Sequence, residues 1–157
     1  MFVMITKCPG SFFQRYHPFL EILDPSTEPN VCYSRSPALY WTIIIIAARR
    51  YGEDISLLGN LVPLVANLVW SAAIQVPLSL YTTQALLLLA TWHSPTDSQW
   101  KDPSLLYVTI AKSAAMQNGL HRPEIIQDFL RVKAKLAPND FQEAVKLWAG
   151  CFIVGEW

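Results

Sequence analysis

The sequence predicts an all-α protein of about six helices, and three features of the chain lead to this prediction. Apolar residues recur at helical spacing through several long stretches, whereas the two-residue alternation of strands is rare. Several stretches begin with a capping residue, in two cases followed by a proline, which suits the first turn of a helix. Hydrophobic residues make up 52% of the 157 residues and charged residues only 15%, so most helical faces must be buried. We therefore expect an irregular array of helices joined by short loops.

The N-terminal segment, residues 1–35, is expected to be irregular. Four prolines interrupt it and leave room only for a short helical piece at residues 12–16: Pro9, Pro18, Pro25 and Pro29. The helical part of the chain is expected to cover residues 36–157. Its first helix begins at the capping pair Ser36-Pro37 and runs to about residue 50. Its four consecutive isoleucines also suit a buried strand, but the length and the caps favour a helix.

The remaining helices follow at regular intervals along the chain. We expect them at residues 55–75, 79–92, 103–117 and 124–136, with a last helix from residue 139. Asp102-Pro103 opens the third of these, and Asn118-Gly119 closes it, because glycine tolerates the left-handed conformation that ends many helices. The last helix shows no stop signal before Trp157, so the array is expected to be truncated at its C-terminal end.

Five short motifs resemble, in order and spacing, the regulatory domain of fungal zinc-cluster transcription factors. This domain is also called the fungal-specific transcription factor domain, or middle homology region. The motifs are RYHPF at residues 15–19, SPALYWTII at 36–44, TQALLLLATW at 83–92, GLHRP at 119–123 and LWAGCFI at 147–153. The first two are most similar to activators of secreted-protease genes. The motif residues for which we expect a structural or regulatory role are Tyr16, His17, Pro18, Ser36, Pro37, Trp41, Gln84, Trp92, Gly119, Leu120, His121, Arg122, Pro123 and Trp148.

The resemblance implies a regulatory domain in the nucleus that controls transcription of target genes by RNA polymerase II. In such proteins DNA is bound by a zinc-cluster module whose six cysteines hold two zinc ions, and those cysteines are absent here. DNA is therefore expected as a partner only through a module outside this chain. The resemblance also implies a homodimer or a transcriptional co-regulator as partner, and a small-molecule effector.

The residues themselves give no sign of catalysis, of metal binding or of a cofactor in this chain. Three widely spaced cysteines fit neither a zinc site nor a disulfide framework: Cys8, Cys32 and Cys151. The net charge is zero, so no basic field is present to hold a nucleic-acid backbone. Neither a serine-nucleophile motif nor a paired-histidine motif occurs, and His121 is expected to hydrogen-bond a helix end. The six tryptophans either line a small-molecule pocket or, as is more usual, fill gaps between helices.

Two alternatives remain open at this point. One is a truncated remnant, or a derivative without DNA binding that sequesters full-length relatives. The other is a small integral membrane protein, because no charged residue occurs between Asp54 and Asp97 and two apolar spans would fit there. Two features count against the membrane alternative: the Asn and Gln side chains within these spans would be buried in lipid, and the prolines at positions 63 and 77 would interrupt the spans.

Overall fold

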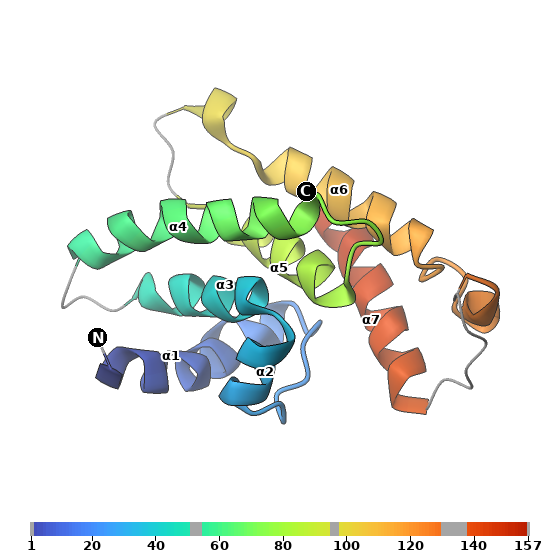
Figure 1. Cartoon of the computed structure of the whole chain (residues 1–157), viewed down its shortest axis with the longest axis horizontal. Helices are drawn as coiled ribbons and strands as arrows, with labels where there is room; N and C mark the ends of the chain where they lie inside the picture. The colour runs from blue at the N-terminus through green and yellow to red at the C-terminus, as the bar shows by residue number, and fades with distance from the viewer. Residues whose placement is uncertain (1, 51–54, 95–97, 130–137, 157) are drawn as a thin grey trace.

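The computed structural model describes residues 2–50, 55–94, 98–129 and 138–156 (Figure 1). Within these ranges the chain forms seven α-helices, three short 3-10 helices and no strand, which confirms the predicted all-α class. The α-helices are α1 (Phe2–Arg15), α2 (Pro29–Arg35), α3 (Pro37–Ala48), α4 (Ile55–Ala73), α5 (Leu80–Thr91), α6 (Ser104–Gln117) and α7 (Pro138–Gly155). The 3-10 helices are His17–Phe19, Gln99–Lys101 and Pro123–Asp128.

Helices α3 and α5 form the centre of the fold. In each of them nine of the 12 residues are buried, so neither helix keeps a polar face. Helix α3 contacts α1, α2, α4 and α5, while α5 also contacts α6 and α7 (Figure 1). The side-chain oxygens of Ser36 and Ser79 accept hydrogen bonds from the backbone N–H groups of Leu39 and Thr82, at 3.2 and 3.1 Å. The cap predicted at Ser36 is thus confirmed, Ser79 caps α5 in the same way at its predicted start, and the isoleucine run is helical.

The N-terminal segment differs from the irregular chain that we expected. It contains α1 and α2, and Phe12 of α1 is completely buried in the core. Pro29 lies in the first turn of α2, where a proline costs no hydrogen bond, but Pro9 lies inside α1. Burial of the α1 side chains against α3 offsets the cost of that internal proline, so the expected break did not occur.

The end of α6 follows the predicted stop signal. Gly119 has a φ of 75°, in the left-handed region, and its N–H donates to the carbonyl of Met116 at 3.0 Å. The N–H of Leu120 donates to the carbonyl of Ala115 at 2.9 Å. This pair of bonds is the Schellman motif, which satisfies carbonyls that the helix end would otherwise leave free.

Two other expectations need correction. Helix α7 ends at Gly155 and Glu156 forms a turn, so the expected continuation of the helix stops there, while Trp157 lies outside the described residues. The helix expected at residues 124–136 is represented by the 3-10 helix Pro123–Asp128, and residues 130–137 lie outside the described part of the chain. No helix in the described ranges is long and apolar enough to span a membrane.

Candidate ligand-binding cavity

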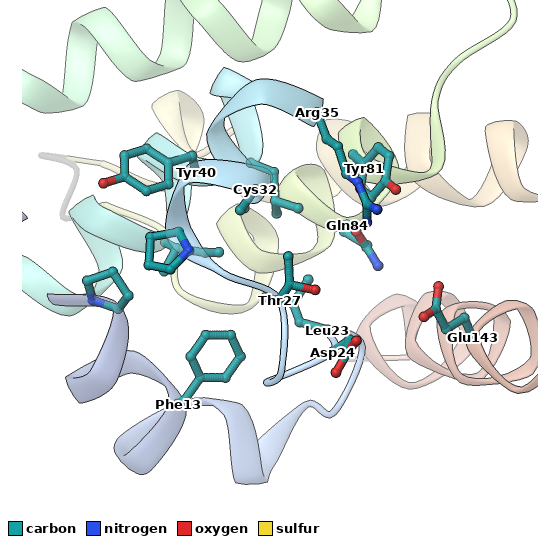
Figure 2. A pocket seen from close by; sticks show the side chains of 14 residues that line it. Phe13, Leu23, Asp24, Thr27, Cys32, Arg35, Tyr40, Tyr81, Gln84 and Glu143 are labelled. Atoms are coloured by element: carbon teal, nitrogen blue, oxygen red, sulfur yellow. The ribbon is translucent and has the colours of Figure 1, made fainter. Parts of the chain in front are cut away.

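A cavity of about 80 Å³ opens between α1, α2, α3, α5 and α7 (Figure 2). Its apolar wall includes Phe13, Leu23, Leu39 and Ile43. A second group of lining side chains is polar and comes from three different helices: Arg35 from α2, Tyr81 and Gln84 from α5, and Glu143 from α7. Figure 2 shows Arg35, Tyr81 and Gln84 gathered on one side, with Glu143 approaching from α7. The cavity therefore combines an apolar surface with charged groups of both signs.

Residues 20–28, which we call the anchored loop, form one wall of the cavity between the 3-10 helix His17–Phe19 and α2. Two motif residues hold this loop at neighbouring carbonyls. Gln84 donates from Nε2 to the carbonyl of Ile22 at 2.8 Å, and His17 donates from Nε2 to the carbonyl of Leu23 at 2.9 Å. A carbonyl oxygen only accepts, so the Nε2 of His17 carries the proton.

The anchored loop also packs closely against α7. Leu20 and Ile22 are buried, and a Cβ placed on Gly150 of α7 would lie 2.7 Å from Cγ2 of Ile22. Glycine is therefore the residue that lets the loop approach the helix backbone. Because α7 also carries Glu143 into the cavity, the loop and α7 form a continuous wall around it.

The polar groups around the cavity have distinct electrostatic surroundings. Hydrogen bonds from the Ser26 side chain and backbone to Asp24 lower the pKa of that carboxyl group and keep it ionised. Burial raises the pKa of the Cys32 thiol, with Arg35 opposing the shift, so the sulfur remains a neutral thiol. Cys32 therefore contributes a small, nearly apolar surface to the cavity and no nucleophile.

Tyr16 and Trp92, both expected from the motifs, meet on the other side of α1. Their ring centroids are 5.5 Å apart, and both rings contact Phe12. The guanidinium of Arg49 donates to the carbonyl of His93, directly after Trp92, and burial lowers the pKa of that guanidinium. This cluster joins α1 to the ends of α3 and α5 and is a packing unit.

The motif at residues 119–123 forms a third cluster, against α7. Leu120 is 1% exposed, and the ring of His121 lies 5.5 Å from that of Phe129 and 6.0 Å from that of Trp148. The Nδ1 atom of His121 is buried and has no hydrogen-bond partner among the described residues, so this atom does not make the hydrogen bond expected to a helix end there. Aromatic packing holds the ring instead.

The other motif residues have smaller parts in these clusters. Ser36 and Pro37 begin α3, Trp41 packs against the core, and Pro18 lies in the 3-10 helix that leads into the anchored loop. Arg122 and Pro123 lie at the surface, where the Arg122 guanidinium is 3.9 Å from Glu124, an exposed pair of little energetic weight. Only His17 and Gln84 of the expected residues therefore connect directly to the cavity wall.

Sequence analysis missed most of the residues that line the cavity, including Arg35, Tyr81 and Glu143. They come from separate helices and form no sequence motif, so only the fold brings them together. No tryptophan lines this cavity, whereas Trp92 lines a separate, more open pocket beside Arg49 and His93. Among the described residues, no three histidine, cysteine or carboxylate side chains are arranged to hold a metal ion.

Comparison with known families matches residues 10–154 of this chain to the fungal specific transcription factor domain. The chain belongs to this family. It is 33% identical over 142 residues to SEF1 of Saccharomyces cerevisiae, which covers 90% of this chain and 12% of that protein. It is 32% identical over 143 residues to the transcriptional regulatory protein SEF1 of Candida albicans, covering 90% of this chain and 15% of that protein.

A more distant relative is the regulatory protein LEU3 of Saccharomyces cerevisiae. The identity is 26% over 160 residues, covering 92% of this chain and 18% of the relative. The chain therefore spans less than a fifth of the length of each relative named here. No solved structure matches it. The family places the five sequence motifs in one regulatory domain, as their order predicted.

Proposed function

We propose that this chain is an effector-responsive regulatory domain that controls transcription by RNA polymerase II in the nucleus. The observation that carries the proposal is the cavity, whose wall links the anchored loop to α2, α5 and α7. A ligand seated there touches elements that are far apart in sequence and stabilises whichever arrangement binds it better. Such a difference in affinity between two states is the physical requirement for an allosteric response.

Other parts of the proposal rest on the family. DNA binding is assigned to a zinc-cluster module outside this chain, with zinc as a cofactor of that module alone. A homodimer or a transcriptional co-regulator is the partner that receives the signal. The chain itself acts as a regulator and has no enzymatic role. The expected similarity to activators of secreted-protease genes stays a prediction, as does the alternative of a truncated or sequestering derivative.

A cavity-filling variant tests the proposal. Residues 1–157 are placed between a heterologous DNA-binding domain and an activation domain in yeast, and reporter expression is compared in rich and minimal medium. We expect the reporter to depend on the medium, and Cys32→Phe to abolish this dependence because the new ring occupies the cavity.

A matched control separates filling of the cavity from a general effect on α2. Ser34→Phe adds the same ring two residues away at an exposed position that does not line the cavity, and it should keep the response. Circular dichroism of the purified variants checks that both remain helical. A reporter that ignores the medium, or that responds equally in wild type and Cys32→Phe, contradicts the proposal.

A further inference from the structure

The chemistry of the cavity wall defines the ligand more closely, given the effector function proposed above. The volume of about 80 Å³ sets the size of the ligand. One water needs roughly 10–15 Å³ of such space, so the cavity has room for roughly five to eight waters or for a small organic molecule of similar size. This excludes nucleotides, sugars and long acyl chains as ligands that are fully enclosed.

The apolar part of the ligand is set by the side chains opposite the polar group. Leu23 and Leu39 are buried, with 8% and 4% exposed, and Phe13 and Ile43 lie beside them in the lining. These side chains offer no hydrogen bonds. A short aliphatic group fits this surface and is stabilised by leaving water.

A negative group on the ligand is favoured by Arg35. Its guanidinium forms no ion pair with any described residue, and Figure 2 shows it turned toward Gln84 and Tyr81. The planar guanidinium binds a carboxylate through two parallel hydrogen bonds, and the Tyr81 hydroxyl lies beside it as a further donor. The polar side of the cavity is thus suited to a carboxylate.

A positive donor on the ligand is favoured by Gln84 and Glu143. The Gln84 side chain is buried, and its Nε2 is committed to the Ile22 carbonyl, while no described residue donates to its Oε1. The amide oxygen therefore remains able to accept a hydrogen bond from a ligand in the cavity. Glu143 adds a negative charge from α7. A ligand ammonium satisfies both groups, whereas a plain carboxylate leaves them unpaired.

We propose that the cavity binds a small α-amino acid with an aliphatic side chain. The carboxylate pairs with Arg35, the ammonium with Glu143 and the Gln84 amide oxygen, and the side chain packs on Phe13, Leu23 and Leu39. Because Glu143 belongs to α7 and Gln84 holds the anchored loop, occupancy of the site draws both elements toward α2. The site thus connects amino-acid binding to the helix that ends the described chain.

The test titrates three probes into the purified chain by isothermal calorimetry: L-valine, 3-methylbutanoate and isobutylamine. The second lacks the ammonium and the third lacks the carboxylate. We expect L-valine to bind, and each of the other two to bind at least about tenfold more weakly, because each lacks the partner for one charged group of the cavity, Arg35 or Glu143. Equal affinity of valine and either analogue overturns the amino-acid assignment.

Single substitutions test which residue binds each end of the ligand. Arg35→Gln should weaken L-valine about tenfold, while Arg50→Gln, an exposed arginine that does not line the cavity, should leave it unchanged. Glu143→Gln should weaken L-valine and leave 3-methylbutanoate unaffected. Loss of binding in the Arg50 variant, or no loss in the other two, overturns the placement.

The outcome also separates this inference from the proposed function. If none of the three probes binds while Cys32→Phe still abolishes the reporter response, the effector cavity stands and the ligand class is wrong. If L-valine binds and the reporter ignores Cys32→Phe, the site is correct and its regulatory role is wrong.

Discussion

Replacing Gly150 with alanine measures how tightly the anchored loop is held against α7. Gly150 is buried, and the new Cβ would lie 2.7 Å from Cγ2 of Ile22. Carbon atoms pack best at about 3.5–4.0 Å, so the loop or the helix must move. The loop cannot simply retreat, because Gln84 holds the carbonyl of Ile22 at 2.8 Å. We therefore expect Gly150→Ala to destabilise the packing of the loop against α7, an effect that is absent when the added Cβ meets no neighbouring atom.

Gly59 in α4 provides the matched control. It is exposed, and a Cβ there meets nothing within 4 Å. Both variants gain the helix preference of alanine over glycine, about 1 kcal/mol. Gly59→Ala should therefore stabilise the fold by about 0.5–1 kcal/mol. Gly150→Ala adds an overpacking cost of about 1–3 kcal/mol, which leaves a net destabilisation of up to about 2 kcal/mol.

The assay is urea unfolding followed by far-ultraviolet circular dichroism at fixed pH for the wild type and both variants. The difference between the two variants isolates packing, because the helix preference cancels, and it should be about 1–3 kcal/mol. Equal stabilisation by both substitutions would refute the close seating of Ile22 against α7.

Three further predictions use the same unfolding assay. Gln84→Met keeps the volume but leaves the buried carbonyl of Ile22 without its donor, so stability should fall by about 1–3 kcal/mol, and no loss would contradict the anchoring. Ser36→Ala and Ser79→Ala each remove a helix cap and should cost about 1 kcal/mol apiece, with additive effects in the double variant. Burial raises the pKa of the Cys151 thiol from 9.0 to about 11, so the unfolded thiol ionises first. Stability from this group is fully present below about pH 9 and is lost as pH rises from 9 through 11, by roughly 3 kcal/mol, and Cys151→Ala should remove this part of the pH dependence.

Local signals in the sequence predicted the central helices well. Ser36 caps α3 as expected, because a side-chain oxygen can accept from an unpaired N–H whatever surrounds the helix. Ser79 caps α5 for the same reason, at the residue where that helix was expected to begin. Gly119 ends α6 for an equally local reason, since a residue without a Cβ adopts a positive φ without steric strain. These features depend on a few neighbouring residues, so the sequence contains them in full.

The N-terminal helices and the cavity depend on contacts that are distant in sequence. Pro9 would end an isolated helix, but α1 gains more from packing against α3 than the proline costs. Gln84 reaches a carbonyl 62 residues away, and nothing in its local pattern indicates that partner. The motif resemblance predicted that His17 and Gln84 matter, but their shared task, holding adjacent carbonyls of one loop, appears only in the fold.

Helix α3 is surrounded by other helices and nine of its 12 residues are buried, which determines how the protein unfolds. Four consecutive isoleucines, Ile43 to Ile46, are each at most 5% exposed, and they face several neighbouring helices at once. Separating α1, α4 or α5 alone from α3 would therefore expose apolar side chains of α3 to water, with no other element to cover them. Partial opening from the middle of the protein is costly on every side, so the helices around α3 melt together as one cooperative body.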